Sequence, residues 1–249
     1  NTYKIGRATT AVVDTVFYAG DPRIDYQMKI DWNERRHLLK AGFDVDIRAM
    51  SVKNEIQFGH VDRPATRNTS LEAAKFEVCN HRWSDLSESR YGVAILNDCK
   101  YGISMNGNEL QLTLLRAAAT PEMRADNGEH TFTYAFTAWE GGFMDSPVVR
   151  EAYDLNVPFV TAAGACAPMS AFALDRENVF IDAIKPAEDG SGDIILRLYE
   201  AKKADTRCRL SFGLPVSRVY ACDMLENVLE ELQIAEDGGN LHLGTFGGK

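Results

Sequence analysis

The strongest constraint on the fold is a strict alternation of apolar and polar side chains between Arg23 and Trp32. The apolar positions, followed by the polar positions between them, are Ile24, Tyr26, Met28, Ile30 and Trp32, then Asp25, Gln27, Lys29 and Asp31. A period of two puts one set of side chains on the buried face of a β-strand and the other set in solvent. The alternation returns at Leu110–Leu114 and Phe132–Phe136, so this segment is one of several half-buried strands.

Further strand signals follow one another at roughly the 8–12 residue spacing typical of sandwiches and barrels. In the first half these segments are Thr9–Tyr18, Leu38–Ile47, Glu55–His60, Lys75–Val78, Tyr91–Leu96 and Ile103–Leu115. In the second half they are Pro158–Val160, Met169–Leu174, Val179–Ile184, Ile194–Glu200, Arg207–Phe212 and Val219–Cys222. Long helical crossovers are absent, so antiparallel pairing is expected.

Helical signals are few. Ser146–Leu155 is expected to form a short helix after the turn at Gly141 and Gly142. Met224–Leu232 has the composition of a helix, although a strand followed by a turn fits equally well. No linker divides the chain, so we treat residues 1–249 as one domain. The fold class that results is all-β, an antiparallel β-sandwich with one or two short helices.

Charge and cysteine content exclude several classes of function. The net charge is −9 with a pI near 5.1, and no basic stripe runs along the chain, which argues against nucleic acid and anionic membranes as partners. No apolar run approaches the roughly 18 residues of a membrane span. The 5 cysteines lie far apart without a CxxC pair, a pattern typical of reduced, mostly buried thiols. The first residue is Asn1, and the chain is expected to be a piece of a longer protein.

A polar cluster follows the apolar strand that begins at Tyr91. Asn97, Asp98, Lys100 and Tyr101 crowd together before Gly102, so an amide, a carboxylate, an ammonium and a phenol share one sheet end. Asn-Asp after a strand is a turn signal, and a solvated hairpin turn is the simplest interpretation. A ligand-binding rim is the alternative.

Other residues that could carry chemistry lack the spacing that would make them specific. His60 with Asp62, or His81 with Asp85, would give two metal ligands where at least three are needed. Cys99 lies beside Asp98, and a neighbouring carboxylate disfavours a thiolate nucleophile.

Two further sets of side chains could act on or bind carbohydrates. A pair of carboxylates for glycoside hydrolysis could be sought in Asp98, Asp126 and Glu129, but sequence alone does not show that two of them flank one bond. Three flat aromatic side chains could stack on sugar rings, although packing in the core is the commoner role: Trp32, Trp83 and Trp139.

A long, ordered series of motifs resembles the C-terminal β domain of glycoside hydrolase family 38 α-mannosidases of the bacterial and cytosolic type. The matching runs are Asp31–Lys40, Glu55–Pro64, Asn68–Ser70, Lys75–Val78, His81–Glu88, Asn97–Gly102, Leu114–Arg116, Asp126–His130, Phe132–Phe136, Arg197–Glu200 and Asp223–Glu226. The resemblance covers nearly the whole chain. The Gly-rich tail Leu241–Lys249 matches poorly, so whether a last strand forms there stays open.

The resemblance implies a galactose-mutarotase-like supersandwich and a role beside a catalytic domain. In such enzymes a zinc ion and a carboxylate nucleophile sit in an N-terminal domain, and terminal α-mannosides are hydrolysed with retention. The positions that match the rim of the family's sugar pocket are Asp98, Arg116, Asn97, Lys100 and Tyr101, which would position a sugar without breaking its bond.

Carried further, the resemblance implies that no catalytic residue and no metal ligand lie in this chain. The partners would be the enzyme's own N-terminal catalytic domain and mannosides or oligosaccharides, the location cytoplasmic, and a homo-oligomer stays open. Alone, the chain would be inactive. A stand-alone carbohydrate-binding or scaffold module is the alternative from another class of function.

Overall fold

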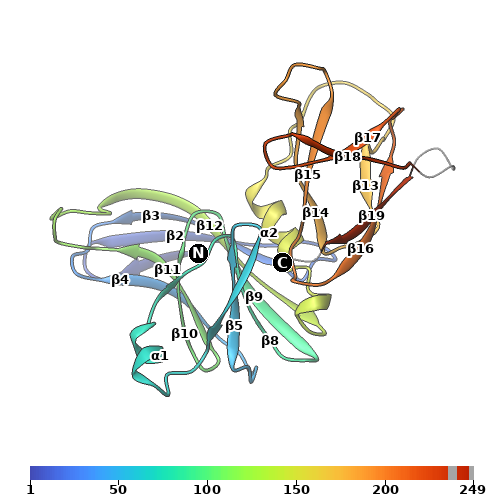
Figure 1. Cartoon of the computed structure of the whole chain (residues 1–249). Helices are drawn as coiled ribbons and strands as arrows, with labels where there is room; N and C mark the ends of the chain where they lie inside the picture. Colours follow the sequence, from blue (N-terminus) through green and yellow to red (C-terminus); the bar gives the residue numbers. More distant parts are fainter. Residues whose placement is uncertain (235–239, 247–249) are drawn as a thin grey trace. The chain divides into compact units, whose positions relative to one another are not determined.

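The computed structural model describes residues 1–234 and 240–246. The chain divides into two compact units, Asn1–Phe159 and Val160–Lys249. The regular structure of both units is mostly antiparallel strand, and the expected all-β class is confirmed (Figure 1). The sequence predicts one domain over residues 1–249, whereas the internal contacts separate into these two units.

The first unit is a sandwich of an eight-stranded and a four-stranded sheet. The larger sheet has the order β1 (Thr2–Ile5), β2 (Thr9–Phe17), β3 (Ile24–Trp32), β12 (Gly128–Glu140), β9 (Tyr91–Asn97), β8 (Trp83–Ser87), β5 (Ser51–Ile56) and β6 (Gly59–Pro64). The smaller sheet has the order β4 (Leu38–Asp44), β11 (Glu109–Arg116), β10 (Gly102–Asn106) and β7 (Val78–Cys79). The strands β6 and β7 are therefore edge strands of the two sheets.

The core of this unit forms because each sheet turns its apolar face towards the other. Ile30 and Ile95 of the larger sheet and Leu110 and Leu112 of the smaller one are fully buried in one cluster. Stacked rings add contacts, with Phe43 of β4 lying 4.8 Å from Phe136 of β12 between centroids. The alternation that predicted β3 and β11 thus decides which side chains enter the core.

The second unit is assembled from small antiparallel sheets. One has the order β13 (Phe172–Leu174), β16 (Thr206–Phe212) and β19 (Asn240–Phe246), and two hairpins pair β14 (Val179–Pro186) with β15 (Ile194–Glu200) and β17 (Val219–Cys222) with β18 (Val228–Leu232). A strand therefore does form in the Gly-rich tail. The segment Met224–Leu232 contains a strand, so its helical reading is wrong.

Several local expectations need correction, because each depended on which strands pair. Glu55–His60 is not one strand but the end of β5 and the start of β6, joined by a turn at Gln57 and Phe58. Ile103–Leu115 is not one strand but β10 and β11, joined by a turn with Gly107 at φ 65°. Pro158–Val160 has no strand, and only the last residues of Met169–Leu174 form β13. Lys75–Val78 contributes only the start of β7, since a short helix, α1 (Ser70–Ala74), precedes it and was not expected. The side chain of Thr69 caps α1 by accepting a hydrogen bond from the N–H of Glu72 at 3.1 Å.

The helix expected after Gly142 is confirmed as α2 (Val148–Asn156), preceded by a 3₁₀ turn, η1 (Phe143–Asp145). It buries Val148, Val149 and Ala152. No helix in the described part of the chain is long and apolar enough to cross a membrane.

A buried charge cluster fixes α2 to the larger sheet. Arg23 donates to the carbonyl of Glu151 at 3.1 Å and forms an ion pair with Asp25 at 2.8 Å. Glu151 itself is only 6% exposed, and burial raises the pKa of its carboxyl. Asp21 and Asp154 raise this pKa further and Arg23 lowers it.

The pH dependence of stability should report this carboxyl. A carboxyl whose pKa is raised in the folded state adds stability that is complete below its unfolded pKa, and that stability is lost as the pH rises through the folded value. Glu151→Gln removes this titration, so we expect the variant to gain stability relative to the parent chain as the pH rises above 4.5, the ordinary pKa of the carboxyl. Urea unfolding at several pH values measures the difference. An exposed control in the same unit is Glu140→Gln at the end of β12, and equal pH profiles for Glu151→Gln and the parent chain would contradict the expectation.

Candidate functional site

The polar cluster that follows β9 lies where the chain crosses from one sheet to the other. β9 pairs with β8 and β12 in the larger sheet, whereas β10 pairs with β7 and β11 in the smaller one. Residues 98–101 are therefore a sheet-to-sheet connection, and the hairpin-turn interpretation is wrong. We call residues 97–101 the crossover loop.

Asn97 holds the crossover loop in place. It is fully buried, its Nδ2 donates to the carbonyl of His81 at 2.7 Å, and its Oδ1 accepts from the N–H of Lys100 at 2.7 Å. Its own carbonyl accepts a hydrogen bond from Asn156 of α2 at 3.0 Å. Every polar group of its side chain is thus used within the fold, which gives Asn97 a structural role.

Asp98 joins the crossover loop to β12. Its N–H donates to the carbonyl of Thr133 at 3.1 Å, and its Oδ2 accepts from the N–H of Thr133 at 2.8 Å. The other oxygen, Oδ1, is enclosed and has no hydrogen-bond partner among the described residues. One oxygen of this carboxylate therefore serves the fold, and the second is unpaired.

Cys99 is not prepared for nucleophilic chemistry. Burial, followed by the neighbouring Asp98, raises the pKa of its thiol to about 11. A thiol with such a pKa carries almost no thiolate near neutral pH. The interpretation of Cys99 as a non-catalytic residue agrees with this environment.

Lys100 and Tyr101 present their side chains at the outer part of the loop. The ammonium of Lys100 lies over the ring of Phe132, 4.2 Å from its centroid. Tyr101 is 54% exposed, with its ring 6.1 Å from that of His81 between centroids. A phenol in this position is free to contact a partner outside the chain.

Arg116 ends β11 in the smaller sheet. Its side chain is exposed, and it forms no ion pair with any residue that the structure describes. Its N–H donates to the carboxylate of Asp126 at 3.1 Å. Gly102 pairs with Thr113, so the strand end at Arg116 lies beyond the residue where the crossover loop enters β10.

The structure does not join Asp98 and Arg116 directly. Asp98 is anchored at Thr133, five steps along β12 from Gly128, which corresponds to about 17 Å of strand. Arg116 is anchored at Asp126, which precedes Gly128. Within residues 1–234 and 240–246 no hydrogen bond or ion pair connects the side chains of Asp98 and Arg116. They could contact different parts of one ligand, but they do not act as one joint hydrogen-bonding group.

The structure also shows the surroundings of the other candidate residues, which are the histidines, the possible metal ligands and the tryptophans. His60 is buried, with its ring 4.8 Å from Phe143 between centroids. Across the described ranges no group of three or more His, Cys, Asp or Glu side chains could hold a metal ion. The tryptophans Trp32, Trp83 and Trp139 are 1%, 1% and 9% exposed, so none offers a face to a sugar.

One supporting element of the site was missed in the sequence. Glu55 of β5 is buried and binds Arg82 through both carboxylate oxygens, with Nη2 to Oε1 at 2.5 Å. Arg82 also lies over the ring of Tyr153 on α2 at 4.1 Å. The carbonyl of Arg82 accepts from the N–H of Asn97 at 2.9 Å, so this ion pair supports the crossover loop.

The available sequence signal for this element was weak. Glu55 opens the Glu55–Pro64 motif and Arg82 follows His81 in the next motif, but 27 residues separate the pair. Burial lowers the pKa of Arg82, and hydrogen bonds and the charge of Glu55 outweigh that effect, so its pKa is raised overall.

Two models of known protein families match this chain. Residues 2–124 match the family model described as "Glycosyl hydrolases family 38 C-terminal domain", and residues 178–246 match "Glycosyl hydrolases family 38 C-terminal beta sandwich domain". The chain belongs to glycosyl hydrolase family 38. The two matched ranges fall in the two units, so the family has a separate model for each of them.

Curated relatives of this family 38 chain are α-mannosidases. It is 42% identical to alpha-mannosidase 2C1 of Homo sapiens over 219 residues, which are 86% of this chain and 21% of that protein. It is 36% identical to alpha-mannosidase G of Dictyostelium discoideum over 241 residues, 93% of this chain and 22% of that protein. The chain therefore spans about a fifth of the length of these relatives.

Solved structures of low sequence identity share the fold. An alpha-mannosidase from Enterococcus faecalis V583 superposes with a TM-score of 0.77 at 18% identity, covering 96% of this chain and 28% of that one. A family 38 protein from Enterococcus faecalis gives 0.72 at 18% identity, covering 96% of this chain and 29% of that one. The expected assignment to the C-terminal β region of a family 38 α-mannosidase is confirmed by these matches together.

Proposed function

We propose that this chain is the C-terminal region of a retaining exo-α-mannosidase that removes terminal α-D-mannosyl residues. The observation that carries the proposal is the ordered match of two family 38 C-terminal models to one chain whose curated relatives are α-mannosidases. The relatives are about five times longer, so the enzyme's chemistry is assigned to sequence outside the matched region.

The role we propose for the first unit is to complete the carbohydrate-binding cleft. Arg116 and Tyr101 carry it, because both are exposed and each has a polar end free for a ligand. A guanidinium can donate to two sugar hydroxyls in a fixed geometry, and a phenol can both donate and accept. Asp98 offers one unpaired oxygen, whereas Asn97 and Lys100 shape the loop through internal contacts.

Zinc and the nucleophile are assigned to another part of the enzyme. The described residues contain no suitable cluster of metal ligands, so we derive no step through zinc in this chain. In the complete enzyme zinc would hold sugar hydroxyls beside the nucleophile, and the residues of this chain would bind and orient the sugar.

The partner that completes the site would be the enzyme's N-terminal catalytic domain. Several large apolar side chains on the first unit are strongly exposed, including Phe17 at 70%, Met50 at 73% and Leu71 at 77%, and an interdomain contact would cover such groups. We propose a cytoplasmic location, supported by five cysteines that form no disulfide, although Cys79, Cys99 and Cys166 are exposed where mostly buried thiols are expected from the sequence.

The proposal is tested by assaying residues 1–249 with an aryl α-mannoside. We expect no turnover above that of buffer, because neither the nucleophile nor the metal is assigned to this chain. Adding the separately expressed remainder of the enzyme should give activity that depends on the concentration of the chain. Turnover by the chain alone would contradict the assignment. Saturable binding of mannosides by the chain alone, with no dependence of the remainder on it, would favour a stand-alone carbohydrate-binding module.

A further inference from the structure

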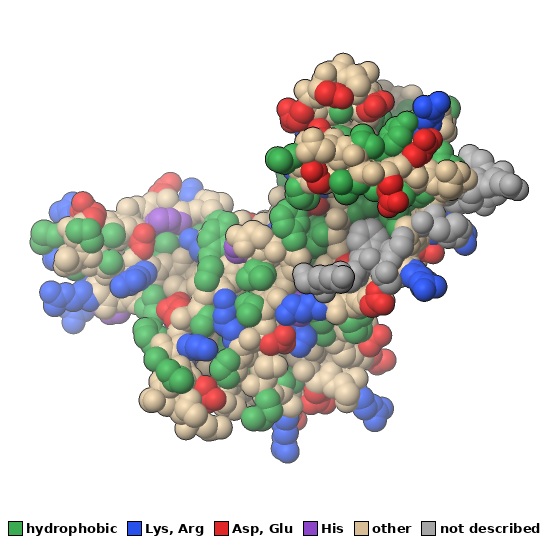
Figure 2. All heavy atoms as spheres, viewed as in Figure 1, with side chains coloured by type: hydrophobic (Ala, Val, Ile, Leu, Met, Phe, Trp, Pro, Cys, Tyr) green, Lys and Arg blue, Asp and Glu red, His purple; other side chains and the backbone are tan. Residues whose placement is uncertain are grey.

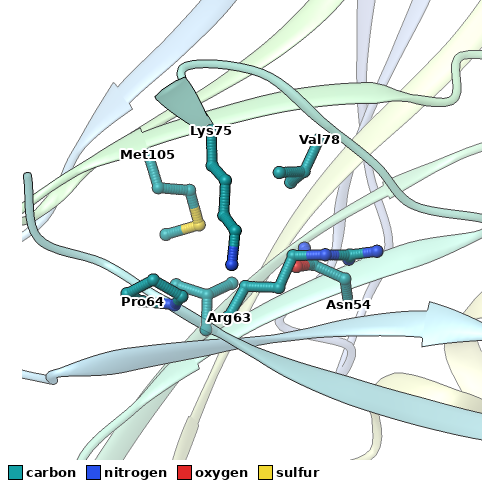
Figure 3. Close-up of a pocket in the computed structure, with 7 residues that line it drawn as sticks. Asn54, Arg63, Pro64, Lys75, Val78 and Met105 are labelled. Atoms are coloured by element: carbon teal, nitrogen blue, oxygen red, sulfur yellow. The ribbon is translucent and has the colours of Figure 1, made fainter. Parts of the chain in front are cut away.

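A small polar pocket opens at the side of the first unit where both sheets end. Its walls come from β5 and β6 of the larger sheet, from β7 and β10 of the smaller sheet, and from the segment after α1 (Figure 3). Val52, Val78 and Met105 supply its apolar lining, while Asn54, Arg63 and Lys75 supply its polar groups. It lies apart from the crossover loop, and the function proposed above does not use it.

Arg63 is a partly buried cation without a counter-charge. Its Nη1 is enclosed and has no hydrogen-bond acceptor, and none of the ion pairs among the described residues includes Arg63. Burial lowers the pKa of its guanidinium, and the nearby Cys79 acts in the opposite direction. An enclosed N–H that lacks an acceptor is costly, so its presence indicates that something from outside the chain supplies one.

Asn54 gives the pocket a second group that lacks a partner. It is fully buried, its Nδ2 lies 2.8 Å from Oγ of Ser84, and its Oδ1 has no partner. A rotation of this amide by 180° keeps the contact with Ser84, whose hydroxyl then donates to Oδ1. The rotated Nδ2 would offer its donors in place of the unpaired oxygen.

Lys75 approaches the pocket from the opposite wall. Its side chain extends from the segment after α1 towards Arg63 and Pro64, with the ammonium at the inner end (Figure 3). Like Arg63, it takes part in no ion pair within the part of the chain that the structure describes. Two cations therefore converge in a chain whose net charge is −9, and although the carboxylate of Glu72 lies close enough to feel the charge of Lys75, Arg63 has no such carboxylate among the described residues.

We propose that Arg63, Lys75 and Asn54 form a binding site for a small tetrahedral oxyanion such as inorganic phosphate. The interior of about 10 Å³ admits one water-sized group, so one oxygen of the anion would enter between the guanidinium and the rotated Asn54 amide, while the ammonium contacts a second oxygen. A water molecule could accept from Nη1 but would leave the charge of Arg63 uncompensated. A neutral sugar would also leave the positive charge of Arg63 uncompensated, so the chemistry of the pocket favours an anion.

Isothermal titration calorimetry of the whole chain with sodium phosphate tests the site, at constant ionic strength maintained with sodium chloride. We expect one saturable event in the millimolar range. Lys75→Gln should weaken it by about tenfold, the value of one charged hydrogen bond, and Arg63→Gln should abolish it. Lys29→Gln is the matched control, because Lys29 is an exposed lysine of the same unit, and this variant should bind phosphate like the parent chain.

Lys75 is exposed, so its replacement should leave the fold intact even if Arg63→Gln impairs folding. As a second measurement, the phosphate-dependent rise in Tm should persist in Lys29→Gln and be lost in Lys75→Gln. The proposal is overturned if no saturable binding of phosphate is seen, if all variants bind phosphate alike, or if chloride competes fully at equal concentration. Those results would mean that water fills the pocket or that phosphate only screens the charges of the chain in general.

Discussion

Replacing Glu55 with alanine is expected to lower the free energy of unfolding by about 3–5 kcal/mol, because Arg82 would lose its counter-charge in a mostly buried setting. The carboxylate of Glu55 is 4% exposed and accepts hydrogen bonds from the backbone N–H, the Nε and the Nη2 of Arg82. Chemical denaturation followed by near-ultraviolet circular dichroism measures the change.

A surface pair of the same hairpin provides the control for Glu55→Ala. Lys53 and Asp62 form an ion pair at 2.9 Å with both side chains partly exposed, so Asp62→Ala should cost no more than about 1 kcal/mol. Glu55→Gln keeps the shape and an acceptor, so its cost should lie between the two. If Glu55→Ala costs as little as Asp62→Ala, the ion pair does not support the fold in the way described here.

The crossover loop should be affected by the same substitution. The carbonyls of His81 and Arg82 bind the side chain and the N–H of Asn97, so movement of this segment would be transmitted to the loop. Hydrogen exchange at Asn97 and Lys100 should accelerate more in Glu55→Ala than in Asp62→Ala. This readout separates local support from a general loss of stability.

Replacing Arg116 with alanine in the complete enzyme is expected to reduce kcat/KM for a mannoside by about 10- to 100-fold, the value of one charged hydrogen bond to the sugar. Tm should change little, because the side chain is exposed and forms no ion pair among the described residues. Steady-state kinetics with an aryl α-mannoside provides the measurement.

Arg150→Ala is the matched control, since Arg150 is an exposed arginine on α2 of the same unit. Arg116 is a cleaner probe than Asp98, because Asp98→Ala would also remove the contact with the N–H of Thr133. Asp98→Asn keeps an acceptor for that N–H and tests the charge separately. Unchanged kinetics in Arg116→Ala would remove Arg116 from the proposed sugar contacts.

The character of the surface agrees with the composition. On the face drawn in Figure 2, acidic, basic and apolar side chains are interspersed, without one continuous basic area. This is the distribution expected from scattered Lys and Arg in a chain of net charge −9, and it gives no electrostatic footprint for nucleic acid on that face.

Local patterns predicted much of the fold. The alternation in β3, β11 and β12 is a property of neighbouring residues, so it could be recognised before any pairing was known. The helix α2 was also predicted close to its observed bounds. The family assignment followed from ordered motifs and was confirmed by the comparisons.

The candidate site was predicted only as a set of residues, and its arrangement was not. The sequence placed Asn97, Asp98, Lys100 and Tyr101 on one short loop, because adjacent residues must lie together. It could not show that Asn97 and Asp98 are occupied by internal hydrogen bonds, or that Arg116 is anchored apart from Asp98. The roles of these residues towards a sugar stay predictions.

The sequence by itself determined the all-β class, the buried face of the main strands and the family. Only the tertiary structure decided that residues 97–101 cross between sheets, that Glu55 pairs with Arg82, and that Arg63 and Lys75 converge on one pocket. The physical reason is that strand periodicity is local, whereas sheet order brings together residues far apart in the chain, and no local pattern encodes which strands will be neighbours.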